Sequence, residues 1–269
     1  MLTMSLARRL SIAILLILVP ALALAQEDPK PKPTSGNDRM FLSFIEDAAV
    51  VDSQWWEGQL ELVDGDGFDA TIVRLVAAFQ PYEDIEVGGR VGFGDTDIAG
   101  IGTPDGSGAT DLDLWFKYHL GSNRGNGEFA VGGTLVVPTG DDTAGLGFDA
   151  FAASAFGAGR WRLDRGIVSG HVGLQINGDG RIFGSPDIDG EIALQAGIGL
   201  LFPVSDTLSV IGEFDYNGER FEGADSDSRV LGGVNWRVTN RGSIRGAVSL
   251  GLTDGAPDAT IIGGYAAVF

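Results

Sequence analysis

The side chains that could support catalysis are few. His119 and His171 are the only histidines of the chain, and Ser169 lies two residues before His171. Residues two apart on a strand point to the same face, so a serine nucleophile activated by His171 is geometrically conceivable. The chain has no Gly-x-Ser-x-Gly nucleophile elbow and no cysteine thiol. A Ser169–His171 hydrolase is therefore the least favoured interpretation, and no catalytic residue is assigned.

Cofactor and metal signals are also missing. Aspartates gather in glycine-rich segments such as 64–67, but the spaced ligand series of a calcium loop, ending in glutamate, is absent. Asp-Gly pairs suit tight turns instead. No Gly-Lys-Ser/Thr sequence is present, so the chain has no phosphate-binding P-loop. The formal net charge of −19 disfavours nucleic acid, whose phosphates need a basic surface. We expect no cofactor, no metal and no nucleic-acid partner.

A larger set of charged side chains recurs at every second position between apolar ones. In 111–120, Leu114 and Phe116 share one face of an extended segment, while Asp113 and Lys117 share the other. Strict alternation is typical of strands whose two faces meet different surroundings. We predict twelve such strands, near 55–63, 69–79, 85–93, 110–120, 127–138, 148–159, 166–177, 189–202, 207–217, 227–238, 242–252 and 259–269. The facing of 148–159 is ambiguous, because it is rich in alanine and glycine.

Strand length and loop length favour a membrane barrel over a soluble sandwich. Most predicted strands have about 9–13 residues, near the ~9–11 that cross a bilayer at a tilt. Links after even-numbered strands are short (80–84, 121–126, 160–165, 203–206 and 239–241). Links after odd-numbered strands include the longest ones (94–109, 139–147, 178–188 and 218–226). Short turns at one end, long loops at the other and an even strand count are typical of outer-membrane barrels, so both chain ends are expected on the periplasmic side.

The N-terminal segment indicates export. Arg8 and Arg9 precede the apolar stretch 12–19, and Ala23-Leu24-Ala25 follows as a small-residue cleavage site. This pattern predicts a signal peptide over 1–25 that is cleaved after Ala25. Residues 26–54 are expected to be a periplasmic linker, within which 40–52 is left open as a short helix, an inner plug segment or part of a first strand. The barrel is predicted over 55–269.

If the apolar face meets lipid, the charged face lines the lumen. Buried charges need water or partners, so they face water, pair with one another, or both. The predicted lumen residues, which would set selectivity, are Arg74, Glu86, Arg90, Asp113, Lys117, His119, Glu213, Asp215, Arg229, Arg237 and Arg245. We expect the arginines and Lys117 to pair with the carboxylates, although the sequence does not show which pairs meet. Twelve strands give a constricted passage rather than a wide pore.

A family resemblance is carried by the stretch 110–142. Asp111 to Tyr118 forms a "D-L-x-L-x-x-K-Y" strand, and Leu135 to Asp141 reads Leu-Val-Val-Pro-Thr-Gly-Asp. With Asp84-Ile85-Glu86-Val87-Gly88, these features resemble the outer-membrane family named for the meta-cleavage pathway of phenol degradation. The resemblance implies a transporter barrel associated with aromatic compounds.

The C-terminal strand also bears on assembly. Phe269 is preceded on the same face by Tyr265 and Ile261. A terminal aromatic strand resembles the assembly signal of outer-membrane barrels, which implies the barrel-assembly machinery as a partner, beside outer-membrane lipid and a small-molecule solute.

The sequence therefore predicts an all-β, antiparallel transmembrane barrel of about twelve strands in the bacterial outer membrane. The predicted function is passage of small molecules, aromatic or otherwise hydrophobic ones among them, through a charged, constricted lumen. The alternative is a non-transporting barrel that serves as a structural or surface-interaction protein.

Overall fold

The computed structural model describes residues 39–40, 47–49, 54–65, 67–98, 106–120, 127–181 and 186–268. The signal peptide 1–25, its cleavage site and Phe269 lie outside these residues. Within them, no helix has the length and apolar character that crossing a bilayer requires.

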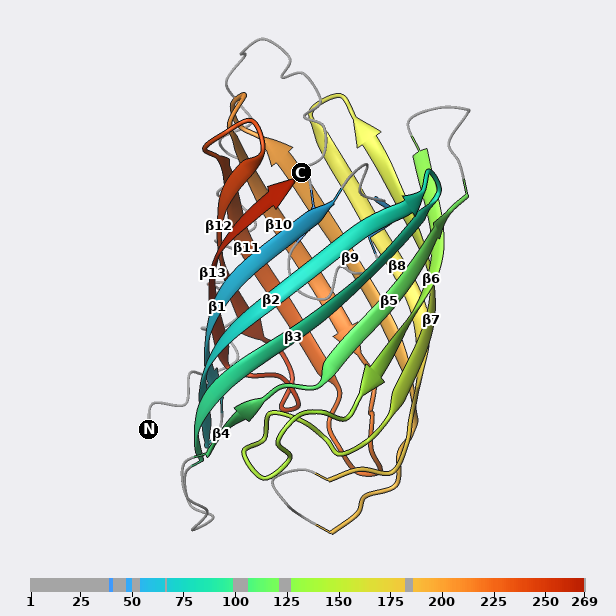
Figure 1. The fold of residues 1–269 in the computed structure, drawn as a ribbon, viewed down its shortest axis with the longest axis vertical. Helices are drawn as coiled ribbons and strands as arrows, with labels where there is room; N and C mark the ends of the chain where they lie inside the picture. The colour runs from blue at the N-terminus through green and yellow to red at the C-terminus, as the bar shows by residue number, and fades with distance from the viewer. Residues whose placement is uncertain are drawn as a thin grey trace.

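The described residues form thirteen β-strands and one antiparallel sheet. The strands are β1 (Trp55–Gly65), β2 (Phe68–Tyr82), β3 (Ile85–Ile98), β4 (Gly106–Ala109), β5 (Leu112–His119), β6 (Gly127–Val137), β7 (Ala152–Leu163), β8 (Gly166–Asn177), β9 (Ile192–Pro203), β10 (Leu208–Asn217), β11 (Asp227–Arg237), β12 (Gly242–Gly251) and β13 (Ala259–Val268). Strands that follow one another in the chain pair with each other, except that β4 and β5 both pair with β3. The first and last strands also pair, from Trp55↔Val268 to Asp64↔Ala259. This last pairing closes the sheet into a barrel with tilted strands (Figure 1).

The barrel has twelve strand positions, as predicted. The short strand β4 pairs with the end of β3, and β5 pairs with the beginning of β3. The two therefore lie end to end along β3 and fill a single position. Closure leaves no unpaired sheet edge, which is the condition for strands to cross lipid.

Side chains alternate between the two faces of the wall. On β2, Ile72 is 8% exposed whereas Val73 is 61% exposed, because Ile72 points into the barrel and Val73 points out. The same alternation exposes Phe116 on β5 and Val172 on β8. Near one end of the barrel, Trp161 meets Phe129 edge-on at 5.5 Å between ring centroids. An outward apolar band with aromatic rings near its border is typical of a barrel in a bilayer.

The connections differ in length between the two ends of the barrel. At the turn end, where β1 begins and β13 ends, residues 83–84, 164–165, 204–207 and 238–241 form tight turns. At the loop end, residues 138–151, 178–191, 218–226 and 252–258 connect the strands. The exception is the β1–β2 connection at the loop end, a tight turn in which Gly67 has a φ of 80°. A positive φ of this size suits glycine, which has no Cβ to clash with the backbone.

Two predicted segments have other boundaries in the structure. The predicted link 94–109 contains the end of β3 and all of β4, because the wall extends past the apolar band, where outward side chains such as Asp95 need not be apolar. The predicted strand 148–159 is β7, which begins at Ala152 and extends to Leu163. Residues 148–151 belong to the loop instead, where Phe148 packs on Phe221 at 5.5 Å between centroids.

The Pro-Thr-Gly-Asp sequence forms the corner at which β6 leaves the wall. A Cβ on Gly140 would lie 2.7 Å from the Cα of Gly147. The backbone of loop 138–151 thus passes itself at a distance that only glycine permits. The next residue, Asp141, accepts hydrogen bonds from Thr143 Oγ1 (2.6 Å) and from the backbone N–H groups of Thr143 and Ala144. The bond from the Thr143 hydroxyl lowers the pKa of the Asp141 carboxyl below its usual value. Loop 138–151 is thereby folded back toward the barrel axis, and Leu146 packs on Ala70 and Ile72.

The outward face gives a direct test of the barrel in a bilayer. Val172→Arg places a charge near the middle of β8 on the apolar band, and it should lower the free energy of unfolding by about 2–4 kcal/mol. Denaturant titration of the protein refolded into lipid vesicles measures this change. The control, Val204→Arg, makes the same substitution at an exposed position of a turn and should change stability by less than about 1 kcal/mol. Equal effects at both sites would contradict the membrane-facing assignment.

Candidate functional site: the barrel lumen

The registers of the strands decide which side chains share the lumen. Arg90 lies opposite Asp113, Glu86 opposite Lys117, and Asp215 opposite Arg229. Directly opposite residues of an antiparallel pair lie on the same face, so all of these point inward. Most of the predicted lumen set occupies this inner face: Arg74, Glu86, Arg90, Asp113, Lys117, Glu213, Asp215, Arg229 and Arg245.

Two residues of the predicted set lie apart from the others. Arg237 ends β11 at the turn end, and its guanidinium donates to the backbone carbonyl of Asp206 in the adjacent turn. His119 ends β5 at the same end, where its backbone N–H donates to Asp84. Both positions continue the inward alternation, but they lie at the border of the wall rather than in the middle of the lumen.

In the turn-end half of the lumen, the side chain of Glu86 is completely buried and receives several cationic and neutral donors. Arg39 donates to both of its carboxylate oxygens at 3.1 Å, Lys117 Nζ lies 3.0 Å from Oε1, and Trp115 Nε1 donates to Oε1 at 2.9 Å. Arg39 also lies over the ring of Trp55, 4.6 Å from the centroid. A carboxylate with this many charge-assisted bonds can stay ionised without water.

A second buried cluster is centred on Asp47. Its Oδ2 is 2.5 Å from Arg160 Nη1, and its Oδ1 accepts the hydroxyl of Ser169 at 2.8 Å. Lys117 Nζ donates to the backbone carbonyls of Asp47 (3.0 Å) and Ala49 (2.7 Å), and thereby joins this cluster to Glu86. The hydroxyl of Ser169, which the sequence offered as a nucleophile, thus donates a hydrogen bond to a carboxylate of the N-terminal segment.

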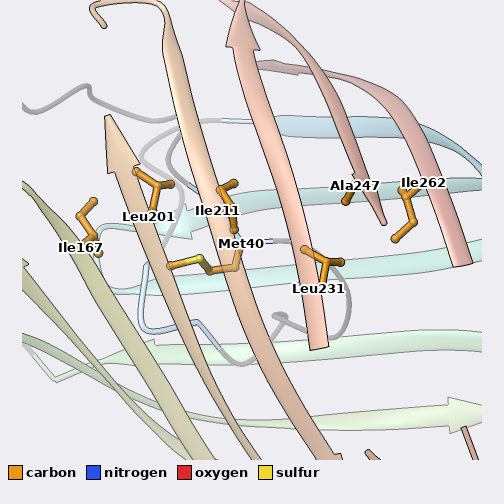
Figure 2. Close-up of a cluster of buried hydrophobic side chains, with 7 residues drawn as sticks. All are labelled: Met40, Ile167, Leu201, Ile211, Leu231, Ala247 and Ile262. Carbon is orange, nitrogen blue, oxygen red and sulfur yellow. The ribbon is translucent and has the colours of Figure 1, made fainter. Parts of the chain in front are cut away.

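The residues before β1 also meet the opposite wall. Arg245 pairs with Glu57 through Nη1, while its Nη2 donates to the carbonyls of Arg39 and Met40, both at 2.7 Å. Met40 projects among the inward apolar side chains of β8 to β13, including Leu201, Ile211 and Leu231 (Figure 2). Charged and apolar contacts therefore hold the same short segment.

These contacts place residues 39–40 and 47–49 inside the barrel. Within the segment 40–52, whose form the sequence left open, Asp47 supplies the charge that Arg160 would otherwise lack, and Arg39 just before it does the same for Glu86. Burial of an ion pair is tolerated when both charges are also hydrogen-bonded, as they are here. The turn-end half of the lumen is consequently filled with side chains.

The loop-end half of the lumen contains a cavity of about 430 Å³. Three ion pairs lie along its wall: Arg74 with Glu61 (2.8 Å), Arg90 with Asp113 (2.6 Å) and Arg229 with Asp227. Neutral amides lie between them, supplied by Gln59, Gln175, Gln195 and Asn217. The space is therefore lined by polar groups that can bind a solute as it passes, and its volume lies within the ~300–1,000 Å³ of small-molecule sites.

Several residues of these clusters were missed by sequence reasoning. Arg39 and Asp47 belong to a segment without strand periodicity, so the sequence left an inner plug as only one of three alternatives for 40–52 and did not indicate their partners in the lumen. Arg160 follows the predicted end of its strand by one residue, and its inward position would have followed from extending the alternation to Leu163. Among the described residues, no group of three or more histidine, aspartate or glutamate side chains is placed to hold a metal ion.

Comparison with known proteins agrees with this architecture. No family model and no curated protein matches the chain. Among solved structures, the COG4313 outer membrane channel from Pseudomonas putida F1 superposes with a TM-score of 0.65 at 17% identity, over 91% of this chain and 100% of that one. The NanC porin (TM-score 0.54, 6% identity, 80% of this chain and 100% of that one) and the KdgM porin (0.53, 10%, 80% and 99%) are also similar.

These likenesses show the fold alone. At such identities, the similarity extends to the arrangement of strands and not to individual lumen residues. The chain thus has the fold of bacterial outer-membrane channel barrels, which are channels and porins rather than enzymes in the three structures named.

The packing of the N-terminal segment can be tested by labelling, because the chain has no native cysteine. Ala48 is fully buried, so Ala48→Cys in the folded protein should react slowly with a water-soluble maleimide. Adding Lys117→Met removes the bonds to the Asp47 and Ala49 carbonyls and should speed labelling roughly tenfold or more. A matched Arg181→Met variant, which changes an exposed loop arginine, should leave the rate unchanged. Equal rates in all three proteins would contradict the role of Lys117 in holding the segment.

Proposed function

We propose that the chain is an exported outer-membrane channel that admits small organic solutes from the loop end into its charged lumen. The observation that carries this proposal is the cavity of about 430 Å³, enclosed by a closed barrel and lined by paired charges. The similar solved structures support a transport barrel in general terms. In this proposal the signal peptide 1–25 is cleaved after Ala25, and the C-terminal strand is read by the barrel-assembly machinery.

The proposed solute class rests on the family resemblance of 110–142. The "D-L-x-L-x-x-K-Y" strand and the Pro-Thr-Gly-Asp corner are similar to the family associated with phenol degradation, which favours aromatic or otherwise hydrophobic solutes. The structure gives both features a physical role, because the strand carries Asp113 and Lys117 and the corner folds loop 138–151 over the cavity. The solute would enter past Leu146 and Phe148 of that loop, which line the cavity.

One observation favours the alternative of a non-transporting barrel. The turn-end half of the lumen contains Arg39, Met40 and Asp47. Arg39 and Asp47 are held by buried hydrogen bonds, and Met40 is held by apolar packing. A brace of this kind would stabilise a structural barrel equally well. Transport and bracing differ in whether a folded sample conducts.

Conductance in planar bilayers tests the proposal. Purified folded protein, identified by heat-modifiable migration on a gel, should give ion-conducting channels under the channel hypothesis. A folded sample without conductance or solute uptake would overturn the transport function and leave the structural alternative.

Lumen charges should set the selectivity of these channels. Arg74→Met with Arg90→Met leaves Glu61 and Asp113 without their cations, so the permeability ratio should shift toward cations. Glu61→Gln with Asp113→Asn should shift the permeability ratio toward anions. The control variant, Arg181→Met, should leave the ratio unchanged. Reversal potentials in a KCl gradient measure the ratio. Variants that alter only stability, with unchanged reversal potentials, would favour the bracing role.

A further inference from the structure

Arg220 differs from the other arginines of the lumen in what surrounds it. It lies in the connection 218–226 between β10 and β11, and its side chain lines the cavity at the loop end. The guanidinium carbon is 4.6 Å from the ring centroid of Phe148 and 5.9 Å from that of Phe221. Two aromatic rings from two different loops thus hold the guanidinium in place by cation–π contact.

Among the described residues, the charge of Arg220 has no carboxylate partner within ion-pair distance. Arg74, Arg90 and Arg229 each lie within 4.0 Å of a carboxylate in the same cavity. In the part of the chain that the structure describes, no carboxylate lies that close to Arg220, whose Nε donates to the amide oxygen of Asn177 at 3.4 Å. Neutral amides and aromatic faces compensate a cation less well than a carboxylate does.

The carboxylates nearest to this site are already bound elsewhere. Asp113 and Asp227 are paired with Arg90 and Arg229. Asp111 accepts the backbone N–H groups of Gly140 (2.9 Å) and Phe148 (3.2 Å), so its oxygens fix the fold of loop 138–151. Burial lowers the pKa of Arg220, which means that its charged form has lost hydration in the loop-end cavity. A partly buried cation that lines a cavity is suited to bind an anion from that cavity.

Part of the cavity surface is apolar, which also limits the solutes that fit it. Besides Arg220 and the charged pairs, the cavity is lined by the apolar side chains of Phe68, Leu146, Phe148 and Pro257. An inorganic ion would leave this apolar surface uncovered. A solute with one anionic group and a compact apolar body would satisfy both surfaces.

We propose that the loop-end cavity binds small organic carboxylates, with the carboxylate on Arg220 and the apolar body against Leu146 and Phe68. This inference rests on the proposed function, because it requires that solutes enter from the loop end. It narrows the solute class from hydrophobic molecules in general to amphipathic monoanions. The acidic loops around the mouth oppose an anion only at short range, because charges are screened beyond about 8 Å at physiological salt.

Calorimetric binding of matched probes to the full folded chain in detergent tests the inference. Benzoate and benzyl alcohol carry the same ring and differ in charge. Wild-type protein should bind benzoate more tightly than benzyl alcohol at neutral pH. Arg220→Met should weaken benzoate binding roughly ten- to hundredfold, the loss expected for charge-assisted bonds, and should leave benzyl alcohol binding unchanged.

Two control variants separate recognition from folding. Arg220→Lys keeps the charge but not the planar fork and should retain part of the preference for benzoate. Arg181→Met removes a loop arginine that is exposed and paired with Asp187, and it should bind benzoate like the wild type. Heat-modifiable migration shows that each variant is folded.

The inference is overturned if wild-type protein shows no preference for benzoate, or if folded Arg220→Met keeps that preference. It is overturned equally if Arg220→Met weakens both probes alike, because the residue would then only shape the cavity. Conductance separates this inference from the proposed function. A conducting protein that does not bind benzoate refutes the carboxylate site alone, whereas benzoate binding without conductance supports the site and refutes transport.

Discussion

Closure of the sheet by β1 and β13 is the constraint on which the rest of the structure depends. Ten directly opposed residue pairs join these strands, from Trp55↔Val268 to Asp64↔Ala259, so the wall has no free edge. In a bilayer every backbone polar group needs an internal partner, and a closed antiparallel sheet supplies one at each position. Closure also explains why apolar and charged side chains alternate, since each strand then has one side toward lipid and one toward a single enclosed lumen.

Closure of the barrel encloses many charged side chains, and these find their partners in different ways in the two halves of the lumen. At the turn end, the wall charges Glu86, Arg160 and Arg245 are satisfied by groups of the N-terminal segment, and water is replaced by protein. At the loop end, the charges pair along the wall itself, often with the residue on the next strand, and the space between them stays open. The same inner face therefore surrounds packed side chains in one half and an open cavity in the other.

The fold was predictable because its signal is local. The segment 111–120 alternates strictly, so the inward position of Asp113 and Lys117 followed from the sequence. Which charges meet did not, because the register that places Arg90 opposite Asp113 and Glu86 opposite Lys117 is visible only in the structure. The N-terminal contacts were not predictable, because Arg39 and Asp47 meet partners 47 to 206 residues away without any periodic pattern. Arg237 shows a third limit, since alternation gives the face of a residue but not its depth along the barrel.

In the proposed carboxylate site, the position of Arg220 would give specificity without weakening the wall of the barrel. Residues of the strands must pair with one another, because an unpaired charge there would destabilise the barrel. A loop residue is free of that requirement, and here two aromatic rings, Phe148 and Phe221, hold its guanidinium over the cavity. The Pro-Thr-Gly-Asp corner matters to this arrangement, because Gly140 and Asp111 set the path of the loop that carries Phe148. Recognition at the proposed site would thus depend on loop geometry, whereas stability depends on the paired inner face.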